Sequence, residues 1–301
     1  MRVISLLPAA TDIVAAGGGS EFLVGMTHEC DKPAHARAAE RVTATTVCDG
    51  PPEEVDARVR ELSHAGAPLF TLDADRIRAL RCDLLITQAL CDVCAVRETD
   101  VRTLAATMSP PPAIVTLGGT TLDGVLADVE RVAAAIGRSS EGASVSAALR
   151  VRMRAVHDRL HEAAAPRPTV AVIEWCDPIY LAGHWVPEMV HRAGGRDVAA
   201  TVGQHSTVST AGTVASADPA VVLIAPCGYD VARAADAART LLARDDWRWA
   251  RDRVVWALDA NQLTRRPGPR LIDGIETIAS ILHPSLFPAP REEFARLVGR
   301  R

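Results

Sequence analysis

Aromatic residues are scarce in this chain of 301 residues. They make up 4% of the sequence, whereas hydrophobic residues as a whole make up 48%. The core must therefore be built mainly from Ala, Val, Leu and Ile side chains. With 23% charged residues, a chain of this length can bury a substantial core as one large domain or two modest ones.

The chain also lacks an excess of positive charge and any long apolar run. Its formal net charge is −4, so we do not expect nucleic acid or an anionic membrane as a partner. No stretch approaches the ~18 apolar residues of a membrane span, which argues against membrane insertion. The apolar stretch after Arg2 is short and interrupted by Pro8, which is typical of a strand and not of a signal peptide. Without an export or lipidation signal, the expected location is cytoplasmic.

Common catalytic and nucleotide-binding motifs are absent too, since there is no GxGxxG, P-loop, GxSxG or HExxH sequence. The sequence instead alternates continuous apolar segments with amphipathic ones, which predicts parallel sheets covered on both faces by helices. The expected strands are residues 3–6, 22–26, 84–87, 113–117, 170–173, 221–224 and 254–257, and helices are expected from residue 11 to Gly17 and over 122–136 and 271–282.

A longer helical pattern covers residues 139–163 and contains no strand signal. Apolar residues recur there at spacings of three and four, and Pro166 and Pro168 prevent the helix from continuing. The predicted fold is therefore α/β, with two Rossmann-like lobes of mostly parallel sheets bridged by one long helix. The predicted domains are an N-terminal lobe over 1–138, a bridging helix over 139–165 and a C-terminal lobe over 166–301.

Polar residues gather where the predicted strands end. Ligands bind beyond the carboxyl ends of parallel strands, so these residues are candidates for a binding site in a cleft between the lobes. The four clusters are Thr27-His28-Glu29-Cys30-Asp31, Gln88-Ala89-Leu90-Cys91-Asp92-Val93-Cys94, Glu174-Trp175-Cys176-Asp177-Pro178 with Gly183-His184-Trp185, and Pro226-Cys227-Gly228-Tyr229.

Seven cysteines are the most specific chemical feature, and a reducing compartment makes disulfides improbable. Thiolate and imidazole side chains suit zinc, copper, iron or an iron–sulfur cluster. We predict Cys30, Cys91, Cys94 and Cys176 as metal ligands, because these thiols follow the ends of predicted strands and because Cys91 and Cys94 have the CxxC spacing of metal sites. Two alternatives stay open, namely that the thiols fill the core as small apolar side chains, or that the CxxC pair is a redox site.

Several other polar residues are candidates for a cleft. Glu29 and Glu174 could act as general bases or hydrogen-bond acceptors, and His184 could handle protons. Arg265, Arg266 and Arg270 precede the last helix, where they could bind an anion or form salt bridges. His157 and His161 are interpreted as solvated surface residues.

The motifs together resemble a known family. Arg2-Val3-Ile4-Ser5-Leu6-Leu7-Pro8-Ala9-Ala10-Thr11-Asp12 is similar to the opening of the cobalamin- and iron-chelate-binding proteins of ABC importers. The first three polar clusters resemble a subgroup labelled cobalamin-binding. The resemblance covers essentially the whole chain. It implies the class III periplasmic-binding-protein fold, a small-molecule or metal-chelate ligand, and a permease partner that the missing export signal does not favour.

Two functions are therefore expected from the sequence. The first is a binding protein that holds a corrinoid (cobalamin) or another metal-containing ligand inside the cell. Its predicted ligand-binding residues are His28, Glu29, Trp175, Tyr180, His184, Trp185, Tyr229 and Arg266. The second is a metalloenzyme on the same fold, with Glu29, Glu174 and His184 as candidate catalytic residues beside a metal or iron–sulfur cluster.

Overall fold

The computed structural model describes residues 1–31, 38–47, 50–90 and 95–299, and the chain divides by its contacts into two α/β units. The N-terminal unit contains Met1–Gly119 and Asp123–Ala148, and the C-terminal unit contains Thr120–Leu122 and Leu149–Arg301. The boundary falls inside the helix α6 (Ser139–Glu162). The sequence-based division treats this helix as a separate segment, whereas its contacts assign one part to each unit.

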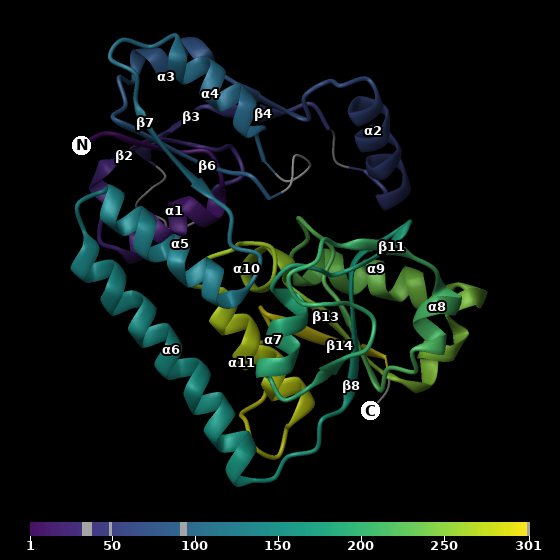
Figure 1. The fold of residues 1–301 in the computed structure, drawn as a ribbon. Coiled ribbons are helices and arrows are strands. Elements are labelled where there is room, and N and C mark those ends of the chain that lie inside the picture. Colours follow the sequence, from purple (N-terminus) through teal and green to yellow (C-terminus); the bar gives the residue numbers. More distant parts are fainter. Residues whose placement is uncertain (32–37, 48–49, 91–94, 300–301) are drawn as a thin grey trace. The chain divides into compact units, whose positions relative to one another are not determined.

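The N-terminal unit is built on a five-stranded sheet in the order β3-β2-β1-β6-β7, in which all strand pairs are parallel (Figure 1). Its strands are β1 (Val3–Ser5), β2 (Leu23–Met26), β3 (Glu40–Arg41), β6 (Leu84–Gln88) and β7 (Ala113–Leu117), with a separate antiparallel pair of β4 (Thr43–Thr45) and β5 (Phe70–Leu72). Its helices are α1 (Pro8–Ala16), α2 (Pro52–His64), α3 (Ala74–Ala79), α4 (Glu98–Ala106), α5 (Leu122–Ala135) and a short 3-10 helix η1 (Ser20–Phe22).

Both faces of this sheet are covered, as the continuous apolar strands predict. Val3 and Ile86 belong to one core cluster, while their neighbours Ile4 and Leu85 belong to another. All four side chains are fully buried or nearly so. Successive residues of a strand point to opposite faces, so the two clusters lie on the two sides of the sheet.

The C-terminal unit contains a seven-stranded mixed sheet in the order β11-β9-β8-β12-β13-β14, with β10 also paired to β8. Its strands are β8 (Thr169–Cys176), β9 (Ile179–Leu181), β10 (Arg196–Asp197), β11 (Thr207–Ser209), β12 (Val221–Ile224), β13 (Val254–Leu258) and β14 (Ala295–Gly299). The pairs of β8, β10, β12 and β13 are parallel, whereas β9, β11 and β14 join antiparallel. Its helices are α7 (Val186–Arg192), α8 (Ala211–Ser216), α9 (Val231–Ala243), η3 (Asp245–Asp252), α10 (Ala260–Leu263) and α11 (Leu271–Leu282).

The few large aromatic residues are distributed unevenly between the units. All five tryptophans and both tyrosines fall within residues 175–256, so they belong to the C-terminal unit. The N-terminal unit has an aliphatic core with Phe22 and Phe70 packed at its edges. In the part of the chain that the structure describes, no helix is long and apolar enough to cross a membrane.

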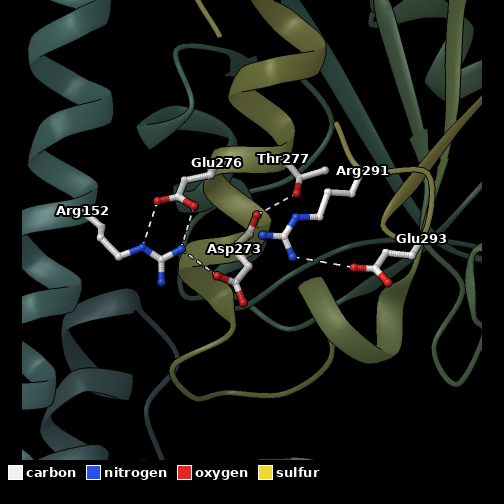
Figure 2. Close-up of polar contacts among 6 residues, drawn as sticks. All are labelled: Arg152, Asp273, Glu276, Thr277, Arg291 and Glu293. Atoms are coloured by element: carbon white, nitrogen blue, oxygen red, sulfur yellow. Dashed lines mark hydrogen bonds and ion pairs between the residues drawn. The ribbon is translucent and has the colours of Figure 1, made fainter. Parts of the chain in front are cut away.

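An ion-pair cluster attaches α6 to α11 inside the C-terminal unit (Figure 2). The Arg152 guanidinium donates to Glu276 through Nε (2.9 Å) and Nη2 (2.6 Å), and Nη2 also lies 2.6 Å from Asp273 Oδ1. These two carboxylates raise the pKa of Arg152 above its usual value. Within α11, the Thr277 hydroxyl donates to the Asp273 carbonyl. Arg291 and Glu293, in the segment that follows α11, form an ion pair nearby.

Replacing Arg152 with alanine is expected to lower the free energy of unfolding of the C-terminal unit by about 1–2 kcal/mol, because a forked, charge-assisted contact between two helices is lost from a partly exposed site. Arg152→Lys should recover only part of this loss, since an ammonium cannot reach both carboxylates in the same fork. Urea denaturation measures the effect. Arg154→Ala, at an exposed position on the same helix, is the control, and an equal loss there would show that the cluster contributes nothing specific.

Candidate functional site

A β-bulge shapes the carboxyl end of β8. Ile173 pairs with Leu181 and Trp175 pairs with Tyr180, so Glu174 is one extra residue on β8 that has no opposite partner. The bulge exchanges the two faces of the strand. Ile173 and Cys176 therefore lie in the same core cluster, while Trp175 packs beside Tyr229 in a different one.

Glu174 is removed from the strand ladder by this bulge and bonds to the following loops. Its carboxyl group accepts hydrogen bonds from the Ser206 hydroxyl and from the Gly183 backbone N–H. The Gly183 N–H also lies 3.2 Å from Ser206 Oγ. Burial raises the pKa of Glu174 from 4.5 to about 7, and the two hydrogen bonds oppose that shift without cancelling it. The carboxyl group thus titrates close to neutral pH.

Gly183 allows two loops of the C-terminal unit to approach unusually closely. A Cβ atom at this position would lie 2.5 Å from both Gln204 O and Ser206 N. The next residue continues the contact, because the His184 N–H donates to Gln204 O (2.6 Å) and the Gly203 N–H donates to His184 O (2.8 Å). The segment after β9 is therefore fixed to the segment before β11 by backbone bonds.

Two imidazoles meet where these loops pair. His184 Nε2 lies 3.2 Å from His205 Nδ1, and the two rings are nearly perpendicular with centroids 5.1 Å apart. His184 has a φ of +52°, a conformation that few residues other than glycine adopt and that often marks a functional position. Burial, and secondly the nearby His205, lower the pKa of His184, so its ring is neutral at neutral pH.

Two neutral imidazoles carry two nitrogen lone pairs, and the hydrogen bond between the rings uses one of them. The other lone pair remains available to a ligand. If His205 Nδ1–H donates to His184, the lone pair of His205 Nε2 is available, and in the opposite tautomer the lone pair of His184 Nδ1 is available. His205 is exposed, whereas His184 is partly buried. A neutral imidazole that is oriented by a second polar group is a common metal ligand in proteins. The pair can therefore offer one nitrogen to a metal centre.

Among the other predicted ligand-binding residues of this unit, Trp185 lies beside the imidazole pair. Trp185 is buried, its indole N–H donates to the Thr264 carbonyl (2.8 Å), and its ring centroid lies 5.5 Å from that of His184. Trp185 thus packs against the imidazole from within the unit. Tyr180 is partly buried in β9, and Arg266 is buried near the start of α11.

Trp175 and Tyr229 form a second aromatic group. Their rings meet edge to face with centroids 5.8 Å apart, and the guanidinium of Arg233 lies 4.2 Å from the centre of the Tyr229 ring. The Trp175 indole donates to the Asp177 carbonyl (3.0 Å). Arg233 is exposed on the first turn of α9, so this group carries a positive charge at the protein surface.

The N-terminal unit holds its own candidate, His28, at the carboxyl end of β2. Its Nδ1 lies 2.7 Å from the hydroxyl of buried Thr43, which also accepts from the His28 N–H and contacts the Thr27 hydroxyl. Arg41 fixes the loop by donating to the carbonyls of Thr27 and Cys30. Glu29 is partly buried beside His28.

Two of the four predicted metal ligands belong to the described residues. Cys30 is buried in the core of the N-terminal unit with its sulfur 3.0 Å from the Thr11 hydroxyl, and Cys176 is buried in the core of the C-terminal unit. Burial raises the pKa of the Cys176 thiol to about 12, which disfavours the thiolate. Cys91 and Cys94 lie outside the described residues. Among those that are described, no group of three or more His, Cys, Asp or Glu side chains could hold a metal ion. The cysteine site and its convergence stay predictions.

Two positions of this candidate site have no signal in the sequence. His205 and Ser206 belong to a polar loop, Gly203–Ser206, that precedes a three-residue strand. Gly183 was recognised only as part of the motif that contains His184. The spacing of 21 residues between the two histidines becomes informative only when β9 and β11 are known to pair.

The mixed α/β architecture, the mostly parallel sheets and the single long helix are those of class III periplasmic-binding-protein-like structures. The chain belongs to the periplasmic binding protein family, whose pattern it matches over residues 3–248. The family resemblance and the fold class predicted from the sequence are therefore confirmed.

Solved structures show the same fold over nearly the full chain. A periplasmic heme-binding protein from Pseudomonas aeruginosa is 22% identical with a TM-score of 0.73, and the match covers 100% of this chain and 98% of that one. The periplasmic heme-binding protein RhuT from Roseiflexus sp. RS-1 is 21% identical with a TM-score of 0.67, covering 95% and 98%. The vitamin B12-binding protein BtuF of Vibrio cholerae is 23% identical with a TM-score of 0.62, covering 94% and 97%. No curated protein matches the sequence significantly.

Proposed function

We propose that this protein binds a metal chelate of the tetrapyrrole class, a corrinoid or a heme, and that an imidazole of the His184–His205 pair coordinates the metal. The pair carries the proposal. His184 has a neutral ring and a left-handed backbone conformation. The ring of His205 is exposed, and its Nδ1 lies 3.2 Å from His184 Nε2. Maintaining such a strained and partly buried histidine costs stability, which is expected at a binding site.

Family membership and the structural neighbours support the same class of ligand. The chain belongs to a family of binding proteins, and the similar structures include proteins that bind heme or vitamin B12. Both ligands contain a metal that accepts an axial nitrogen ligand from protein. In this chain, His205 Nε2 would supply that nitrogen, and His184 would orient the ring as its hydrogen-bond partner.

The proposal is tested by titrating the purified chain with heme and, separately, with aquocobalamin, whose axial water a histidine can replace. Coordination by His205 should shift the absorbance spectrum of the bound chelate. His205→Ala is expected to abolish that shift. His184→Asn should lower the affinity by roughly 10–100-fold, because asparagine tolerates the left-handed backbone but cannot orient the second ring.

His64→Ala is the matched control, since His64 is an exposed histidine at the end of α2. It should leave both the affinity and the spectrum unchanged. A chelate that binds with an identical spectrum to wild type, His205→Ala and His184→Asn would refute coordination by the pair. If neither heme nor aquocobalamin binds at micromolar concentration, the proposed ligand class is refuted.

A cytoplasmic location stays a prediction, as does the expectation that a permease partner is not favoured. Cell fractionation combined with antibody detection tests the first. Co-purification with membrane components tests the second. Neither result bears on whether the isolated chain binds a tetrapyrrole.

A further inference from the structure

The helix α6 carries two histidines one turn apart, His157 and His161, close to its C-terminal end. Both side chains are exposed. Their rings lie parallel within 5°, and the ring centroids are 6.0 Å apart. Side chains four residues apart on a helix lie on the same face, so the backbone brings the two imidazoles together without help from any other element.

We propose that His157 and His161 form a surface site for a divalent transition-metal ion, with one nitrogen from each ring and water in the remaining positions. This site belongs to α6 and is independent of the proposed tetrapyrrole site. Imidazole suits copper(II), nickel(II) and zinc, and copper(II) should bind most tightly of the three. A pair of ligands is compatible with the absence of any three-residue cluster among the described residues.

Geometry and charge both permit this site. Each nitrogen must approach to about 2.0–2.1 Å from a zinc-like ion, which requires the two rings to turn toward each other. Because both side chains are exposed, such rotamer changes meet no core packing. The negative end of the helix dipole favours a cation in the last turns of α6.

The charged neighbours are of both signs. Asp158 and Glu162 lie on α6 next to the histidines, and both are exposed. Arg154 and Arg159 are also exposed on this helix. The Arg159 guanidinium donates to the Leu286 carbonyl and lies over the Phe287 ring, so its charge is held by the segment after α11. The two negative charges of Asp158 and Glu162 therefore balance the two positive charges of Arg154 and Arg159 near the proposed metal site.

The experiment is a copper(II) titration of the full chain, prepared without a polyhistidine tag and followed by NMR. Bound copper(II) should broaden the amide signals of the last turns of α6, residues 154–162. Either His157→Gln or His161→Gln should lower the affinity at least about tenfold, because the second imidazole binds at high effective concentration once the first is engaged. Calorimetry with nickel(II) should give the same order of affinities among the variants.

Two controls separate this site from other histidines. His64→Gln removes a single exposed histidine and should change nothing, while His184→Asn with His205→Ala removes the other imidazole pair and should leave broadening of α6 intact. The proposal is overturned if α6 is not broadened, or if broadening persists in the double variant His157→Gln/His161→Gln. Failure here would leave tetrapyrrole binding unaffected, since the two titrations use different residues and different probes.

Discussion

Replacing Glu174 with glutamine is expected to raise the free energy of unfolding by up to about 3 kcal/mol at pH 8 to 9. Burial raises the pKa of the Glu174 carboxyl group from 4.5 to about 7 in the folded protein. Glutamine is nearly isosteric, and its amide oxygen can accept one of the hydrogen bonds from Ser206 and Gly183. Its NH2 group replaces the second carboxyl oxygen, and the Ser206 hydroxyl can rotate to accept from it. The substitution therefore removes the charge that burial penalises and keeps most of the hydrogen bonding.

The pH dependence has a definite sign. Between pH 4.5 and about 7 the folded protein holds a proton on Glu174 that the unfolded chain releases, so the wild-type protein loses stability as pH rises through this window. Above pH 7 the full penalty applies, and below pH 4.5 it vanishes. The difference between Glu174→Gln and wild type should therefore grow from near zero at pH 4.5 to its full size at pH 8.

Urea denaturation at a series of pH values measures this difference. Glu292→Gln, at an exposed position, should show no comparable gain. A glutamine variant that is less stable than wild type at pH 8 would mean that the carboxylate makes favourable contacts that outweigh its burial. A constant difference at all pH values would show that Glu174 does not titrate in this range.

Replacing Gly183 with alanine is expected to have the second large effect, a loss of about 3 kcal/mol in the free energy of unfolding. The added Cβ would lie 2.5 Å from Gln204 O and from Ser206 N, and backbone atoms cannot move aside as a flexible side chain can. The two loops would have to separate, which would break the bonds between His184 and residues 203–204. The imidazole pair would then lose its geometry.

Gly212→Ala is the matched control because it has the opposite expected sign. Gly212 lies in α8, where its added Cβ would meet only Thr210 Oγ1 at 3.8 Å. Alanine in a helix is favoured over glycine by roughly 0.5–1 kcal/mol. Thermal unfolding and heme titration should show Gly183→Ala to be less stable and weaker in binding, with Gly212→Ala unchanged in binding. Wild-type stability in Gly183→Ala would contradict the close loop contact.

Much of the fold could be predicted because its central strands are buried on both faces. Val221–Ile224 is such a fully buried strand and has the predicted bounds. Ala113–Leu117 also has the predicted bounds, although β7 is a partly buried edge strand, and Leu271–Leu282 is a helix over the predicted range. Continuous apolar runs between polar segments leave little choice of element. The short strands β9, β11 and β14 were not predicted, because segments of three to five residues that join the sheet antiparallel carry no clear period and depend on a partner strand.

The candidate site was predicted only in part, for a related reason. Glu174 and His184 follow recognisable strands, so their place at a strand end could be inferred. Their chemistry depends on tertiary contacts. The bulge that releases Glu174 depends on how β8 pairs with β9, and the loop pairing that brings His205 to His184 joins residues 21 apart in sequence. Cys176 shows the opposite case, where a residue in a promising motif points into the core.

The uneven distribution of aromatic residues gives the two units different optical properties. With every tryptophan and tyrosine in the C-terminal unit, absorbance at 280 nm and intrinsic fluorescence report on that unit alone. Unfolding of the N-terminal unit would be silent in fluorescence and visible only in backbone circular dichroism. A tetrapyrrole bound near His184 would lie in the same unit as all five tryptophans, so quenching of their emission would follow its arrival without any added label.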